Sequence, residues 1–202
     1  MSVSRRTIFL AIAAIGMGGV SFAQTPPMSR LRGTIDAVDG SSVHVTTRAD
    51  EHVTMKLASD AGCTLIEPIS IEAIKPGSFI GTAAVTQTDG TLKALEVQVF
   101  PESMRGIGEG HRPWDLGIGS TMTNGTVGDL KVSDGRLLTL VYKGGEQKVF
   151  VPEKVPVITY EPATCEVLKK GAHIIAFVTK GEDGTLTGMR IGVGKDGLVP
   201  PM

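Results

Sequence analysis

The stretch between positions 104 and 122 gathers side chains that could bind a metal ion. Methionine and histidine together suit copper(I), whereas histidine with carboxylates makes a harder site that suits zinc or another divalent ion. A ligand set drawn from this stretch would belong to a metal-handling protein. The candidate residues are Met104, Glu109, His111, Trp114, Asp115 and Met122.

The same stretch also fits a rigid junction between two domains. Pro113 and Trp114 could wedge between the domains, with the indole burying a large apolar area and its N–H donating to a carbonyl. Arginine–carboxylate pairs would then fix the angle between the domains. A pocket for a small organic ligand or a peptide is a third interpretation. The arginines of such a junction are Arg105 and Arg112, and their expected partners are Glu102, Glu109 and Asp115.

The sequence carries no recognisable catalytic constellation. It lacks the GxSxG nucleophile elbow, the HExxH zinc motif and the GxxxxGKS/T phosphate loop. The glycine-rich run from Gly106 to Gly110 neither follows a clear strand nor opens a helix, which argues against a nucleotide site. We therefore predict a protein without enzymatic activity.

The elements that must position this stretch form an internal repeat. Residues 66–100 align without a gap on residues 160–194, sharing a Glu-Pro pair, a glycine and an Asp-Gly-Thr-Leu run. Upstream, RGTIDAVDG aligns with NGTVGDLKVSDG once an insertion is allowed. This pattern indicates two tandem copies that arose by duplication.

Each copy predicts β structure. Apolar and polar residues alternate in three segments, a short helical turn follows, and two more alternating segments meet at an Asp-Gly turn. Three strands, a helix and two strands is the order of an OB-type five-stranded barrel. We therefore predict an all-β protein with short helical turns, built as two tandem five-stranded OB-like barrels. One β-sandwich built from both repeats is the alternative.

The N-terminus predicts a signal peptide. Arg5 and Arg6 precede an apolar core from Ile8 to Val20, and Ser21-Phe22-Ala23 fits the small-x-small rule for cleavage after Ala23. The apolar run is too short for a comfortable membrane span, so we expect no stable membrane insertion after cleavage. The general secretory and twin-arginine routes both remain open. The mature protein would be periplasmic or secreted.

The predicted organisation follows from the leader and the repeat. Residues 1–23 form the signal peptide, 24–102 the first barrel, 103–119 a glycine-rich linker, 120–195 the second barrel and 196–202 a tail.

The two cysteines, Cys63 and Cys165, bear on the compartment. In an oxidising compartment two cysteines commonly pair, and because these two are not at equivalent repeat positions, a disulfide would join the copies. Two buried free thiols and a metal thiolate are the alternatives.

Charge and composition limit the partners. The leader holds 2 of the 20 Lys+Arg and none of the 21 Asp+Glu, so the mature net charge is 18 − 21 = −3. With aromatic residues at 4% as well, we expect no nucleic-acid binding. The expected partner is an unknown periplasmic protein or a small ligand.

Several motifs carry a family resemblance. They are Arg32–Gly40 (RGTIDAVDG), Ile74–Thr82 (IKPGSFIGT), Asp89–Val97 (DGTLKALEV), the linker MRGIGEGHRPWD and the ending VGKDGLVPPM. In these motifs the chain resembles a group of small, exported, largely uncharacterised bacterial proteins with tandem OB-like β-barrel repeats. The resemblance implies fold and location, and it implies no activity.

In residue types alone, the linker region is also similar to periplasmic copper chaperones of the copper/silver efflux type. Those small barrels use one histidine, two methionines and a tryptophan that covers the metal, and His111, Met104, Met122 and Trp114 supply the same types at other spacings. Two functions are therefore expected: a periplasmic non-enzymatic binding or interaction protein of unknown ligand, or a metal-binding protein that handles copper or zinc at the linker.

Overall fold

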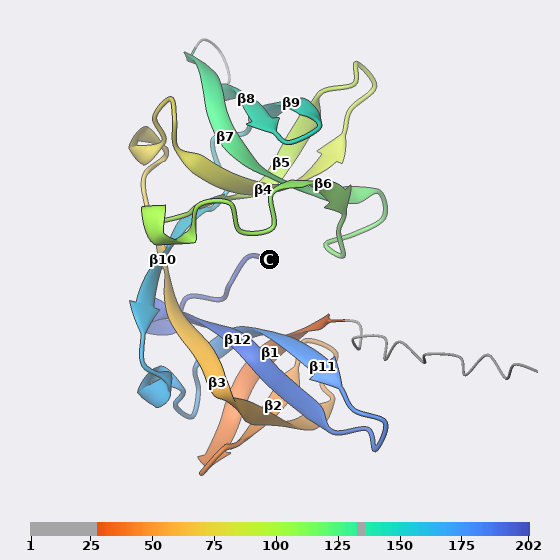
Figure 1. The fold of residues 1–202 in the computed structure, drawn as a ribbon, viewed down its shortest axis with the longest axis vertical. Coiled ribbons are helices and arrows are strands. Elements are labelled where there is room, and N and C mark those ends of the chain that lie inside the picture. The colour runs from red at the N-terminus through yellow and green to blue at the C-terminus, as the bar shows by residue number, and fades with distance from the viewer. Residues whose placement is uncertain (1–27, 133–135) are drawn as a thin grey trace, which may run out of the picture.

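The computed structural model describes residues 28–132 and 136–202 (Figure 1). The predicted signal peptide, residues 1–23, lies outside the described residues. The described chain consists of strands and single-turn 3-10 helices, so the all-β prediction with short helical turns is confirmed. Within the described ranges, no helix is both long enough and apolar enough to cross a membrane.

Five strands close into a first barrel, which we call barrel I. They run in the order β12-β11-β1-β2-β3, and a parallel pairing of β12 with β3 closes the ring. Its strands are β1 (Ser29–Asp39), β2 (Ser42–Thr47), β3 (His52–Pro68), β11 (His173–Lys180) and β12 (Leu186–Gly194).

A second ring of five strands, barrel II, lies above barrel I in Figure 1. Its order is β5-β4-β7-β8-β9, and a parallel pairing of β5 with β9 closes it. A short strand, β6 (Gly110–Pro113), pairs with β7 outside the ring. The ring strands are β4 (Phe79–Thr86), β5 (Leu92–Val99), β7 (Ser120–Val132), β8 (Arg136–Tyr142) and β9 (Gly145–Val151).

The two barrels do not coincide with the two sequence repeats, which corrects the predicted domains 24–102 and 120–195. Barrel I joins three strands of the first repeat to the last two strands of the second, because β1 pairs with β11 and β3 with β12. Barrel II joins β7, β8 and β9 of the second repeat to β4 and β5 of the first. The repeats have exchanged their last two strands.

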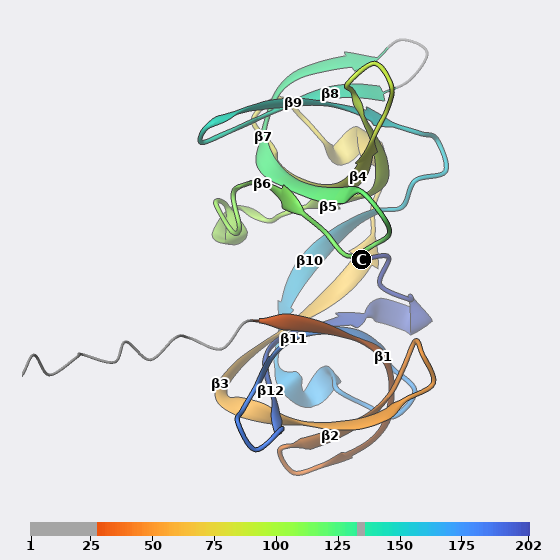
Figure 2. The ribbon, with the colours of Figure 1, turned by 90° about the vertical axis from the view of Figure 1, so that its right-hand side faces the viewer.

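Strand β3 explains why the chain crosses over. It extends over 17 residues and stays paired with β12 of barrel I as far as Ile66, so the chain is still extended where it approaches barrel II. Its end, Cys63–Pro68, pairs antiparallel with β10 (Val157–Ala163), which runs the opposite way between the barrels. Figures 1 and 2 show this two-stranded connection beside the gap between the barrels.

Each barrel has its own apolar core, and the exchanged segments complete it. Leu168, which follows the 3-10 turn η3 (Cys165–Val167), is buried in the core of barrel I, and its repeat equivalent Ile74 is buried in barrel II. Cys63 of β3 and Cys165 of η3 form a disulfide, so the structure has the pairing that joins the copies. Removing this apolar surface from water is the main source of stability.

Candidate functional site

A cavity of about 640 Å³ lies between the two barrels. Barrel I contributes residues of β1, β3, β11 and β12 to its lining, and barrel II contributes residues of β5 and β7. The stretch from Met104 to Trp114 lines it as well, together with Tyr160 of β10 and Met202. In both ribbon views the chain ends in the space between the barrels, which agrees with Met202 being 2% exposed.

Thioethers and aromatic rings dominate the lining of this cavity. Phe100, which follows β5, and Tyr160 of β10 stack with their ring centroids 5.4 Å apart and form a flat aromatic part of the wall. Methionine side chains are flexible and polarisable, and they adapt to ligands of varied shape. The residues of these two kinds are Met28, Met104, Met122, Met202, Phe100, Trp114, Tyr160 and Phe177.

Three arginines also line the cavity: Arg30, Arg112 and Arg190. The guanidinium carbons of Arg30 and Arg112 lie 4.0 and 5.7 Å from the ring centroid of Trp114. That of Arg190 lies 5.0 Å from the ring of Phe177. Such cation–π contacts hold a guanidinium in place while leaving most of its N–H donors free.

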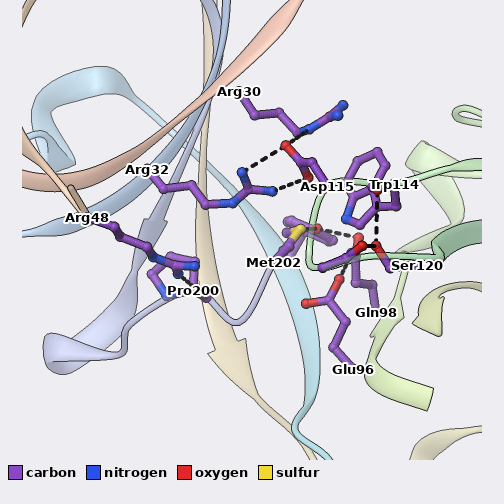
Figure 3. Close-up of polar contacts among 12 residues, drawn as sticks. Arg30, Arg32, Arg48, Glu96, Gln98, Trp114, Asp115, Ser120, Pro200 and Met202 are labelled. Atoms are coloured by element: carbon purple, nitrogen blue, oxygen red, sulfur yellow. Dashed lines mark hydrogen bonds and ion pairs between the residues drawn. The ribbon is translucent and has the colours of Figure 1, made fainter. Parts of the chain in front are cut away.

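Asp115 joins the linker to barrel I (Figure 3). Its two carboxylate oxygens accept hydrogen bonds from Arg30 at 2.8 Å and from Arg32 at 2.8 and 3.0 Å. Partial burial alone would raise the pKa of Asp115, but the hydrogen bonds from Arg32 and Arg30 outweigh it and bring the pKa to about 2. The carboxylate is therefore charged at neutral pH and shared by both guanidinium groups.

Buried polar side chains form a series of hydrogen bonds at the interface between the barrels (Figure 3). Gln98 Nε2 donates to Glu96 Oε1 at 2.6 Å, and the Tyr160 hydroxyl donates to Gln98 Oε1 at 2.7 Å. Glu96 is fully buried, and desolvation raises its pKa to about 7 despite the hydrogen bond from Gln98 and the attraction of Arg32 and Arg48. Its second oxygen, Oε2, has no hydrogen-bond partner among the described residues.

The structure separates the residues predicted to bind a metal. In the β6–β7 ladder Arg112 pairs with Met122 and His111 pairs with Thr123, so His111 and Met122 lie on opposite faces. His111 is exposed, bonds to Thr123 Oγ1 at 2.8 Å and stacks near Tyr142, away from the cavity. Within residues 28–132 and 136–202, no cluster of three or more His, Cys, Asp or Glu side chains could hold a metal ion.

The remaining candidates are divided as well. Met104, Trp114 and Met122 share the cavity lining. Glu109 also lines the cavity, but its Oε1 accepts from the backbone N–H of Lys143 at 2.9 Å. Asp115 forms ion pairs with Arg30 and Arg32 of β1. The predicted six-residue ligand set does not converge on one point.

The junction interpretation agrees with part of the geometry. Arg105 pairs with Glu102 at 2.6 Å, as one of the expected pairs. Arg112 instead donates to the carbonyl of Gly108 at 2.5 Å and forms no ion pair with any described carboxylate. Trp114 lies between the barrels, yet its buried Nε1–H finds no acceptor among the described residues, contrary to the expected carbonyl contact. Pro113 ends the short strand β6.

Several site residues were missed by sequence reasoning, although one signal was available. Glu96 and Gln98 stand two positions apart in the apolar second half of β5, a spacing that places both on one face. Phe100 continues that face into the cavity lining. Arg30 and Arg32 carried no comparable signal, because their partner Asp115 is more than eighty positions away.

No protein-family model matches the chain, and comparison with the curated proteins and with the solved structures found no match.

Proposed function

We propose that the chain is an exported, non-enzymatic binding protein that holds a small, largely apolar organic molecule between its barrels. The cavity of about 640 Å³ carries this proposal. Small-molecule sites have volumes of about 300–1,000 Å³ and are lined mainly by apolar and aromatic side chains with a few polar groups. The methionines, stacked rings and arginines described above make such a lining, and its groups are of kinds that bind a ligand rather than attack it.

Two further features support an exported protein. The leader over residues 1–23 has the composition of a signal peptide. The Cys63–Cys165 disulfide is of the kind that persists in oxidising compartments such as the periplasm.

The fluorescence of Trp114, the chain's single tryptophan, tests the proposal. The mature protein is titrated with N-phenylnaphthylamine, an uncharged apolar dye that accepts energy from tryptophan. We expect saturable transfer with one dye per chain. A linear, non-saturable signal would overturn the proposal.

A cavity-filling variant makes this test specific. Gly62 lines the cavity, and a Cβ built there meets no atom within 4 Å, so Gly62→Phe would place a ring at the cavity without a clash at its Cβ. Ser59→Phe is the matched control, because Ser59 is an exposed residue of the same strand outside the lining. We expect Gly62→Phe to abolish dye binding and Ser59→Phe to leave it unchanged.

Copper(I) handling is the second candidate function, and one observation favours it. Met104, Met122 and Trp114 share the cavity with Met28 and Met202, so thioether ligands and an indole are present together. Three arginines in the same lining oppose it, because they repel a cation. Competition of the reduced protein with a chromogenic copper(I) chelator tests it: a stoichiometric copper(I) complex that Met104→Leu and Met122→Leu abolish would establish this function.

A further inference from the structure

Charge on the cavity wall is unbalanced. Arg30, Arg112 and Arg190 line the cavity, against one acidic side chain, that of Glu109. Glu109 already accepts a hydrogen bond from the backbone of Lys143. Asp115 lies outside the lining and is shared by Arg30 and Arg32, so it has little capacity left for another guanidinium.

Arg112 is the most available cation of the three. Among the described residues its one hydrogen bond goes to the Gly108 carbonyl, whereas a guanidinium has five N–H donors. Partial burial lowers the pKa of Arg112, and the charge of Arg30 lowers it further, so a nearby anion would relieve both effects. Arg190 is more exposed, and it donates only a weak hydrogen bond, at 3.6 Å, to the sulfur of Met28 among the described residues.

The indole adjoining Arg112 adds an unused donor. Trp114 lines the cavity, and its buried Nε1–H has no acceptor among the described residues. Buried donors are nearly always satisfied, so this N–H is available to a ligand oxygen once the side chains that cover it move aside. A guanidinium and an indole N–H in one lining suit the oxygens of a carboxylate, sulfate or phosphate.

From this asymmetry we infer that the ligand is a single-chain amphipathic anion whose acidic head binds Arg112 and whose hydrocarbon lies against the methionines and aromatic rings. This inference rests on the proposed function, since it names the class of molecule that the cavity takes. A fully apolar ligand would leave the arginines desolvated without a partner, and a cationic one would meet their repulsion.

Head-group discrimination tests the inference. Dodecanoate, dodecyl phosphate, dodecanol and dodecyltrimethylammonium are each used below their aggregation concentration to displace N-phenylnaphthylamine. A charge-assisted hydrogen bond favours the anions over the alcohol by about tenfold or more. We expect both anions to bind most tightly and the cation least.

Variants then identify the residue that binds the acidic head group of the ligand. Arg112→Gln is expected to lower the affinity for dodecanoate to that for dodecanol. The affinity for dodecanol should stay unchanged. Arg136→Gln, in β8 and outside the lining, is the matched control and should leave all four affinities as they are. If Arg112→Gln does not fold, Arg112→Lys keeps a charge and should retain part of the preference for anions.

The outcomes separate this inference from the proposed function. Equal displacement by anion, alcohol and cation, or displacement by none of them although the dye binds, would overturn the head-group inference and leave the proposed function standing. Absence of dye binding would overturn both. A preference for anions that survives Arg112→Gln unchanged would show that the head does not bind Arg112.

Discussion

The buried carboxyl of Glu96 should make the stability of this protein fall as pH rises. Its pKa is raised from the usual 4.5 to about 7, so between these values the folded chain holds a proton that the unfolded chain has released. Stability is therefore full below pH 4.5, declines across the interval and is level again above pH 7. Each pH unit costs about 1.4 kcal/mol, which amounts to about 3 kcal/mol in all.

Replacing Glu96 by glutamine should remove this dependence. The amide oxygen can still accept from Gln98, and an amide has no charge to desolvate at any pH. We expect Glu96→Gln to have nearly wild-type stability at pH 5 and to exceed the wild type by up to about 3 kcal/mol at pH 8.

Urea unfolding at pH 5, 6, 7 and 8 measures this difference directly. Glu72→Gln serves as the control, because Glu72 is exposed on the single turn η1 (Ile71–Ala73). A wild-type stability that follows the same pH profile as Glu96→Gln would refute the reasoning. It would mean that Arg32 and Arg48 compensate the charge of Glu96 fully.

Three other changes test the structure. Asp115→Asn removes the negative charge shared by Arg30 and Arg32 and leaves them one acceptor oxygen. It should cost about 1 kcal/mol in urea unfolding, a small value because the carboxylate is partly exposed; an unchanged midpoint would contradict a stabilising pair. Replacing Cys63 and Cys165 together by serine should lower stability by about 2–4 kcal/mol, measured by thermal unfolding, whereas reductant should then have no further effect. Gly33→Ala should fold poorly, because its Cβ would meet the carbonyl oxygen of Thr46. Gly62→Ala should be tolerated, because a Cβ there meets no atom within 4 Å. Equal melting temperatures of the two variants would refute the packing described for β1.

Much of the local fold could be predicted from the sequence because it depends on neighbouring residues. The Asp39-Gly40 and Asp89-Gly90 turns lie at hairpins, and Gly40 and Gly90 have positive φ values of 56° and 83°. Strand pairing between the repeats could not be predicted in the same way. The last two strands of each copy have similar apolar patterns, so either pair can complete either barrel, and the length of β3 decides between them.

The candidate site was only partly predictable for a related reason. Met104, Trp114 and Met122 do share one lining, as their proximity in sequence suggested. The position of His111 depends on which face each residue of β6 presents, and nothing in a four-residue strand indicates that alternation beforehand. Glu96 and Arg32 lie near the linker residue Asp115 through tertiary packing, which joins residues far apart in the chain.

The exchange of strands between the repeats also implies an order of assembly during synthesis. All ring strands of barrel II fall within the continuous span 79–151, whereas barrel I needs residues 29–68 together with 173–194. As the chain emerges from its N-terminus, barrel II can therefore form while barrel I is still open. The open strands β1, β2 and β3 must wait for the last part of the chain, and during that wait the equivalent strands of another copy could close them instead. Slow emergence or crowding at that stage should favour interlocked dimers over monomers.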